Sequence, residues 1–117
     1  MAAPNLRILN LEQGLPSADA AETRLRLEIA TLRRSGGVRF VRVIHGYGST
    51  GTGGAIRARV RSWLAAQVRE KRLQGAVPGE SFGPADPASL ALAAKYPAVR
   101  ELPDWNARNP GTTIVAI

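Results

Sequence analysis

The sequence predicts an α/β fold in a single domain spanning residues 1–117, because strand-like and helix-like stretches alternate along it. Residues 38–45 form a β-branched and aromatic run that is typical of a covered strand. From Ile56 onward, apolar residues recur at spacings of three and four, as in an amphipathic helix. A predicted strand and a predicted helix also precede residues 38–45. This strand–helix–strand order implies a parallel pair of strands with a right-handed crossover.

The first strand is predicted at residues 5–11, where apolar side chains alternate. Its expected inward side chains are Leu6, Ile8, Leu9 and Leu11. After a turn, Ser17 is a suitable N-cap for the first helix, which Gly36 and Gly37 should end.

The second strand, 38–45, leads into a glycine-rich loop at residues 46–54. We predict that the second helix runs from about Gly54 to Gln74 and stops at Gly75. A strand, a loop with uncovered backbone N–H groups and a helix N-terminus, in that order, favour an anion-binding site.

The C-terminal third is expected to be largely irregular. A weak strand is predicted at 76–82, where Pro78 confines it to a sheet edge. The segment 83–111 should contain one short helix, from Pro87 to about Lys95 and capped by Asp86. Tyr96 and Trp105 are expected to attach this segment to the sheet, and residues 112–117 to form the last strand.

Composition points to a cytoplasmic protein. Cysteine is absent, which fits a reducing compartment and leaves no thiolate metal site. The longest apolar run is far too short to span a membrane, and the N-terminus does not read as a signal peptide. We therefore predict no membrane partner.

The positive charge is concentrated in one part of the chain. The formal net charge is +7, and it divides into +1 for residues 1–37, +7 for 38–75 and −1 for 76–117. A basic surface on one strand–loop–helix unit favours phosphate backbones, and hence nucleic acid, as the partner. A solvated arginine-rich face would have the same composition. The anion-site geometry favours the first interpretation.

Three junctions resemble the Smr (small MutS-related) domain family. His45-Gly46-Tyr47-Gly48 resembles its His-Gly-x-Gly motif, and Ile56-Arg57 resembles the opening of the helix that follows. The stretch 109–115 is similar to its closing glycine-rich turn and last strand, and Gly14-Leu15 to its first strand–helix junction. The resemblance implies a two-layer sandwich of order β-α-β-α-β-β, with a mixed sheet of about four strands and both helices on one face. It also implies binding to DNA or RNA and, in some members, nicking without a clear metal cluster.

The sequence departs from the family pattern in three places. The usual first-strand Leu-Asp-x-His-Gly motif has no counterpart of its Asp and His in residues 9–14, where Glu12 is the only carboxylate. The glycine-rich loop is a few residues longer than usual. A segment at about 83–108 is inserted before the last strand.

The candidate site residues cluster around the loop. His45, the only histidine, is predicted to act as a general acid or base or as a phosphate donor, with Glu12 assisting. The alternative is a structural histidine whose ring is satisfied by a neighbouring carbonyl. Tyr47 could stack on a base or pack as a lid. The predicted phosphate-binding residues are Gly46, Tyr47, Gly48, Ser49, Thr50, Gly51, Gly53, Gly54, Arg57 and Arg61.

The main hypothesis is therefore a nucleic-acid-binding domain that contacts the phosphate backbone. Two alternatives stay open, a DNA or RNA nicking endonuclease that uses His45, and a binder of a small phosphate ligand or nucleotide. No metal or cofactor is predicted. The loop matches Gly-x-Gly-x-x-Gly, but Glu70 falls inside a helix and not at the end of the next strand, where a ribose-binding acid belongs.

Overall fold

The computed structural model describes residues 5–14, 16–47 and 51–117. It contains a four-stranded sheet of order β1-β2-β4-β3, in which β1 pairs parallel to β2 and the other pairs are antiparallel. The elements in chain order are β1 (Leu6–Asn10), α1 (Ala18–Ser35), β2 (Phe40–Ile44), α2 (Gly51–Arg69), β3 (Gly75–Pro78), α3 (Pro87–Lys95), the 3₁₀ helix η1 (Pro97–Glu101) and β4 (Thr112–Ala116). The predicted α/β fold with a mixed four-stranded sheet is confirmed.

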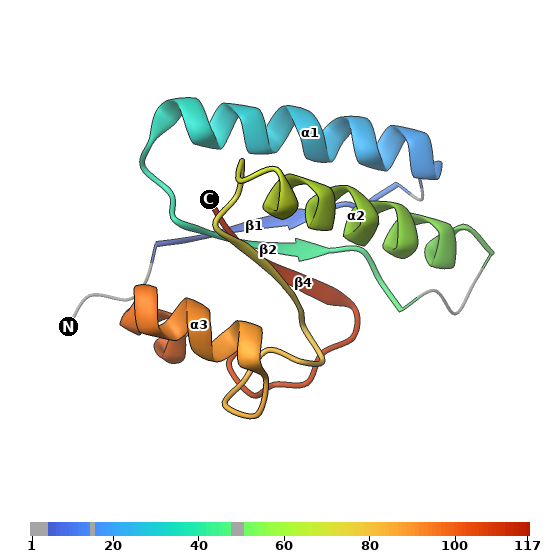
Figure 1. Cartoon of the computed structure of the whole chain (residues 1–117). Helices are drawn as coiled ribbons and strands as arrows, with labels where there is room; N and C mark the ends of the chain where they lie inside the picture. The colour runs from blue at the N-terminus through green and yellow to red at the C-terminus, as the bar shows by residue number, and fades with distance from the viewer. Residues whose placement is uncertain (1–4, 15, 48–50) are drawn as a thin grey trace.

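The helices α1 and α2 cover one face of the sheet, and α3 lies on the other (Figure 1). Strand side chains alternate between the two faces, so Val41 and Val43 join the helix-side core while Phe40 joins the core beneath the inserted segment. The central strand β4 is buried along its whole length. The insert thus adds a layer to the predicted sandwich.

Local signals fix the ends of α1 and α3 as predicted. The Ser17 hydroxyl accepts the N–H of Ala20, and Gly36 ends α1 in the left-handed conformation at φ 72°. The Asp86 carboxylate accepts the N–H of Ser89 at the start of α3. These side chains satisfy backbone groups that have no partner inside the helix.

The predicted limits of the second helix were wrong at both ends. The helix begins at Gly51, so Gly51, Gly53 and Gly54 lie inside α2 and not in a loop. It ends at Arg69, because Lys71 takes the left-handed conformation at φ 61° that usually selects glycine. This early stop allows Leu73 to be buried, at 3 % exposure, and Gly75 then begins β3.

The prediction that Ile8 points inward was wrong, because Ile8 is 54 % exposed on the insert side of edge strand β1. The insert does attach to the sheet through aromatic contacts, as predicted. The rings of Phe40 and Tyr96 meet edge to face at 5.9 Å, and those of Phe82 and Trp105 at 5.2 Å.

Candidate nucleic-acid interface

The candidate site lies where the end of β2 meets the turn before β4. The backbone N–H groups of His45 and Gly46 both donate to the carbonyl of Gly111, at 3.0 and 3.1 Å. Gly46 needs its positive φ of 82°, and a Cβ there would collide with the carboxylate of Glu12. The turn 109–111 is thereby joined to the first residues of the predicted loop.

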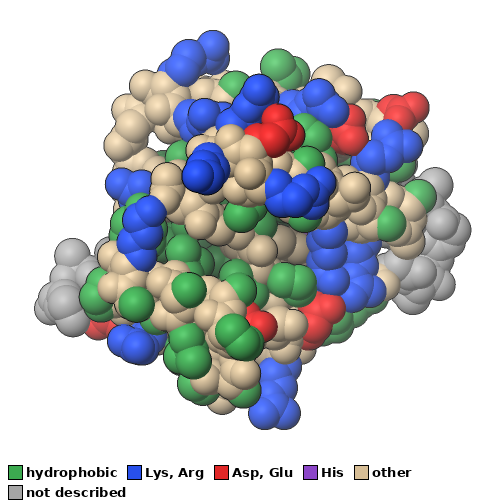
Figure 2. All heavy atoms as spheres, viewed as in Figure 1, with side chains coloured by type: hydrophobic (Ala, Val, Ile, Leu, Met, Phe, Trp, Pro, Cys, Tyr) green, Lys and Arg blue, Asp and Glu red, His purple; other side chains and the backbone are tan. Residues whose placement is uncertain are grey.

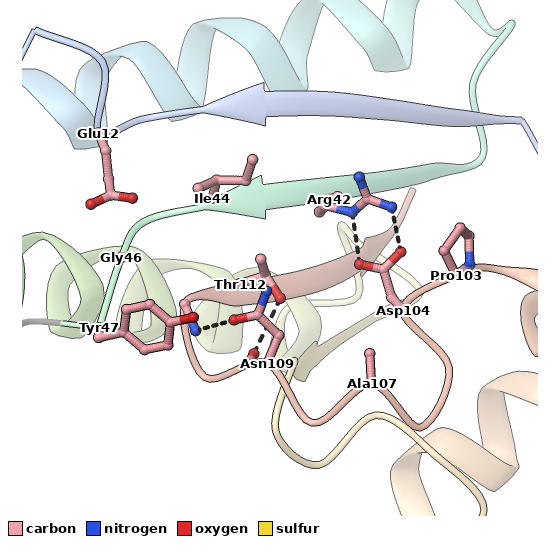
Figure 3. Close-up of a pocket in the computed structure, with 11 residues that line it drawn as sticks. Glu12, Arg42, Ile44, Gly46, Tyr47, Pro103, Asp104, Ala107, Asn109 and Thr112 are labelled. Carbon is pink, nitrogen blue, oxygen red and sulfur yellow. Dashed lines mark hydrogen bonds and ion pairs between the residues drawn. The ribbon is translucent and has the colours of Figure 1, made fainter.

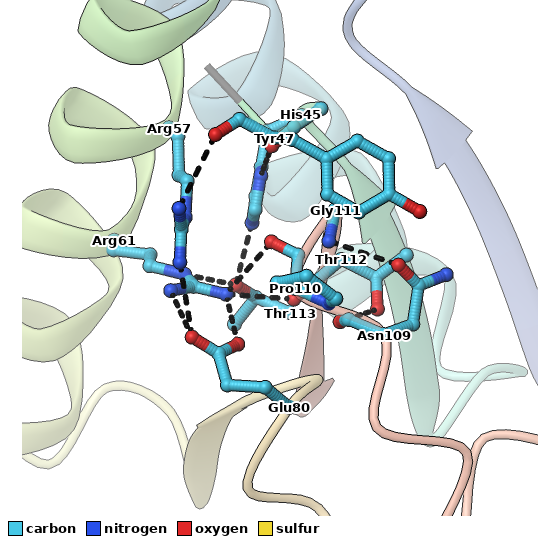
Figure 4. A network of polar contacts seen from close by, with 11 residues as sticks. His45, Tyr47, Arg57, Arg61, Glu80, Asn109, Pro110, Gly111, Thr112 and Thr113 are labelled. Atoms are coloured by element: carbon cyan, nitrogen blue, oxygen red, sulfur yellow. Dashed lines mark hydrogen bonds and ion pairs between the residues drawn. The ribbon is translucent and has the colours of Figure 1, made fainter. Parts of the chain in front are cut away.

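His45 is fully buried, and both of its ring nitrogens have partners (Figure 4). Nδ1 lies 2.9 Å from the carbonyl of Gly46, which can only accept, so Nδ1 carries the proton. Nε2 lies 2.8 Å from the hydroxyl of Thr113 and accepts its hydrogen when the ring is neutral. Burial lowers the pKa of His45, and the charges of Arg61 and Arg57 lower it further. This geometry matches the structural alternative for His45.

Thr113 connects the histidine to the basic helix. Its hydroxyl donates to His45 and accepts from Arg61 Nε at 3.1 Å. Arg61 also donates to the carbonyls of Pro110 and Thr112 at 3.3 and 3.1 Å. The predicted anion ligand Arg61 therefore holds the turn before β4 in place.

Arg57 and Arg61, one helical turn apart on α2, converge on the carboxylate of Glu80 (Figure 4). The Arg61 contacts measure 2.6 and 2.9 Å and the Arg57 contact 3.0 Å. The hydrogen bonds from Arg61 lower the pKa of Glu80 to about 2. Arg57 also donates to the carbonyl of Tyr47 at 3.3 Å. The two arginines form a preorganised oxyanion site that Glu80 fills.

The remaining predicted residues fall into two groups. Gly48, Ser49 and Thr50 lie outside the described residues, whereas Tyr47 is described and its side chain is 60 % exposed. The Glu12 carboxylate is exposed and lies against Gly46, so it reaches the predicted rim. His45 makes its two ring contacts to other residues, and the catalytic roles of His45 and Glu12 stay predictions.

Three residues of this network were not among the predicted site residues, namely Thr113, Glu80 and Asn109. Glu80 lies 19 residues from Arg61 and Thr113 lies 68 residues from His45. No helical or strand period connects such positions. Only the fold brings them together.

Exposed basic side chains also spread over the two-helix layer. Figure 2 shows Lys and Arg side chains gathered on this part of the molecule, with a few acidic ones among them. Two of these arginines are paired, Arg26 with Glu22 at 3.0 Å and Arg59 with Asp19 at 2.5 Å. For Arg33 and Arg34, the structure shows no ion pair within the described ranges.

Across residues 5–14, 16–47 and 51–117, no three His, Asp or Glu side chains gather in a way that could hold a metal ion. Among the helices that the structure describes, none combines the length and apolar character that a membrane crossing requires.

Comparison with known families gives one match. The family model described as Smr domain matches residues 13–82, which include α1, β2, α2 and β3. Neither the curated proteins nor the solved structures contain a match to the chain. The strand β1, the inserted segment at about 83–108 and β4 all lie outside the matched residues.

Proposed function

The chain belongs to the Smr domain family, and from this membership we propose that it binds nucleic acid through the phosphate backbone. The family as a whole points to interaction with nucleic acid. The proposed contact surface is the loop after β2 and the first three turns of α2, with Arg57 and Arg61. The proposal keeps the cytoplasmic location predicted from the sequence.

The observation that carries the proposal is the convergence of Arg57 and Arg61 on one carboxylate beside the loop. Guanidinium groups bind phosphate and carboxylate oxygens in the same bidentate geometry. The positive end of α2 lies next to them, and its first turn contains no acidic residue. A phosphate group that replaces Glu80 would meet two guanidinium groups already in position.

Contacts of this kind position a strand without reading its sequence. Each phosphate contact releases a counterion, so the logarithm of the binding constant should fall linearly with the logarithm of the salt concentration. We expect weak sequence selectivity and strong salt dependence. A small phosphate ligand would not give the steep dependence expected of a polymer.

The test is titration of fluorescent single- and double-stranded DNA and RNA at several salt concentrations. Arg57→Gln should weaken binding and reduce the salt slope by about 1. The matched control is Arg100→Gln, which removes an exposed arginine from η1 on the opposite face of the sheet. Absence of binding to every polymer at low salt would refute the proposal.

The same mixtures address the alternative of a nicking endonuclease that uses His45 with Glu12 assisting. One observation favours it, because the Glu12 carboxylate lies against Gly46, the residue next to His45. Strand products on a denaturing gel that disappear in Glu12→Gln, while binding persists, would establish a nicking enzyme. Binding without products would leave a binding domain. If a nucleoside phosphate raises the melting temperature and no polymer binds, the small-ligand alternative holds.

A further inference from the structure

A hollow adjoins the loop after β2 on the insert side of the sheet (Figure 3). Its volume is about 390 Å³, within the range of roughly 300–1,000 Å³ that small-molecule sites occupy. It is lined by Arg42 and Ile44 from β2 and by several residues between Pro103 and Thr112. Gly46 and Tyr47 line it too, so the hollow opens directly beside the proposed phosphate-binding loop.

The walls of the hollow are partly apolar. Ile44, Pro103 and Ala107 contribute apolar surface. At the rim, the ring of Tyr47 rests against Gly111, where an added Cβ would lie 3.4 Å from the ring carbon Cζ. The ring is nonetheless 60 % exposed, and an exposed aromatic face beside a pocket is what a nucleobase stacks on.

Polar groups also line the hollow. Asn109 Oδ1 accepts the N–H of Gly111 at 2.9 Å, which orients the amide, and neither hydrogen of Nδ2 is bonded to another of the described residues. The exposed carboxylate of Glu12 supplies acceptors on the opposite side. The hollow therefore offers both donors and acceptors, which match the donors and acceptors on the edge of a nucleobase.

An ion pair joins the two walls of the hollow, which are β2 and the insert. Arg42 and Asp104 form a bidentate pair at 2.7 and 2.8 Å, and Asp104 is only 9 % exposed. This pair joins β2 to the segment 103–111 across the hollow (Figure 3). The pair thus limits how far the two walls can separate.

We propose that this hollow receives one unstacked nucleobase of the bound strand, stacked on Tyr47 and contacted at its edge by Asn109 and Glu12. The inference rests on the proposed function, because Gly46 and Tyr47 belong both to the hollow and to the loop that is proposed to contact the phosphates. A base can enter only when it is free of its duplex partner. The favoured ligand is therefore single-stranded nucleic acid, or a loop or end in which bases are splayed out.

The test compares two oligonucleotides that have the same backbone, one with all its bases and one with abasic sites at its centre. Both carry the same phosphates, so the difference in their affinities reports base contacts alone. We expect the wild-type protein to bind the intact strand roughly 5- to 140-fold more tightly, as expected for one stacked base. Intact duplex should bind more weakly than intact single strand.

Two variants test whether the preference for the intact strand arises in the hollow. Tyr47→Ala removes the stacking ring, and Ala107→Trp fills the hollow from an exposed position. Each should bring the intact strand down to the affinity of the abasic strand while leaving the salt slope unchanged. Leu90→Ala is the control, because it truncates a side chain that is 43 % exposed on α3.

The outcomes separate this inference from the proposed function. Equal, salt-dependent affinities of the wild type for intact and abasic strands would overturn the base site and leave backbone binding standing. A preference for intact strand that survives in both variants would also overturn it. Binding to neither strand would refute the proposed function, and the base site with it.

Discussion

His45 contacts both the turn before β4 and β4 itself, although its side chain is fully buried. Its backbone N–H reaches Gly111, and its ring spans from the Gly46 carbonyl to Thr113. The motif that singled out His45 in the sequence thus lies at the centre of the site. In this structure its ring supports the surrounding backbone.

The lowered pKa of His45 makes stability depend on pH. The unfolded chain takes up a proton near the ordinary pKa of 6.5, whereas the buried ring resists it. Stability should therefore fall as the pH drops from 7 toward 5, by up to about 1.4 kcal/mol per pH unit. Urea unfolding at pH 7, 6 and 5 measures this slope. Because His45 is the only histidine, His45→Gln should flatten it, and an unchanged slope would contradict the assignment.

Thr113 is the second residue on which the network depends, and it is 2 % exposed. Thr113→Val keeps the shape but leaves His45 Nε2 and Arg61 Nε without their shared partner. The expected loss of unfolding free energy is about 1–3 kcal/mol for each unsatisfied group. Thr113→Ser keeps the hydroxyl and should cost only about 1 kcal/mol. Equal denaturation midpoints for the two variants would show that the hydroxyl contributes little.

Among the elements, β3 and its following turn depend on one close backbone approach. Gly79 donates its N–H to the Thr112 carbonyl at 2.8 Å, and a Cβ on Gly79 would overlap the carbonyl of Asn109. Gly79→Ala should therefore destabilise the fold by about 1–3 kcal/mol in chemical denaturation. Gly37→Ala is the control, because a Cβ there meets nothing within 4 Å. A similar midpoint for both variants would contradict this view of the turn.

Elements with strong local signals could be predicted from the sequence. Ser17, Gly36 and Asp86 act within three or four residues of themselves, and each ends or begins a helix where expected. The end of α2 could not be predicted, because Lys71 has no intrinsic preference for the left-handed conformation. It adopts that conformation because tertiary packing buries Leu73.

The candidate site was predictable only in part, for the same physical reason. Its location followed from the order of strand, glycine-rich loop and helix, all of which are local in sequence. Its chemistry depends on Glu80 and Thr113, which approach Arg61 only after the sheet has formed. Ile8 shows the same limit, since its exposure depends on how far a distant insert extends.

Over the whole molecule, the charge distribution differs from what the sequence alone suggested. The excess of +7 in residues 38–75 includes Arg57 and Arg61, but the fold brings Glu80 from the acidic third of the chain between them. Two of the charges nearest the loop are thereby partly neutralised. The net attraction for phosphate at this position then depends on one carboxylate.

Glu80→Gln should therefore strengthen binding to nucleic acid and weaken the fold. The variant removes the negative charge between the two guanidinium groups, while Arg57 keeps its bond to the Tyr47 carbonyl and Arg61 its bonds to Thr113 and two carbonyls. We therefore expect higher affinity and a salt slope that is steeper by about 1–2 phosphate contacts. The carboxylate, with its pKa lowered to about 2, stabilises the native state above the ordinary value of 4.5, and this contribution is lost as the pH falls toward 2. The variant should thus unfold more readily than wild type at pH 7, with a smaller difference near pH 2.

Glu101→Gln is the matched control for this variant. It changes the net charge by the same amount at an exposed position on η1, where no ion pair forms among the described residues. Polymer titrations and urea unfolding of both variants separate the two effects. Equal gains in affinity would mean that only the net charge matters. A gain confined to Glu80→Gln would mean that phosphate and Glu80 compete for the same two arginines, because only that variant removes the negative charge from their shared site.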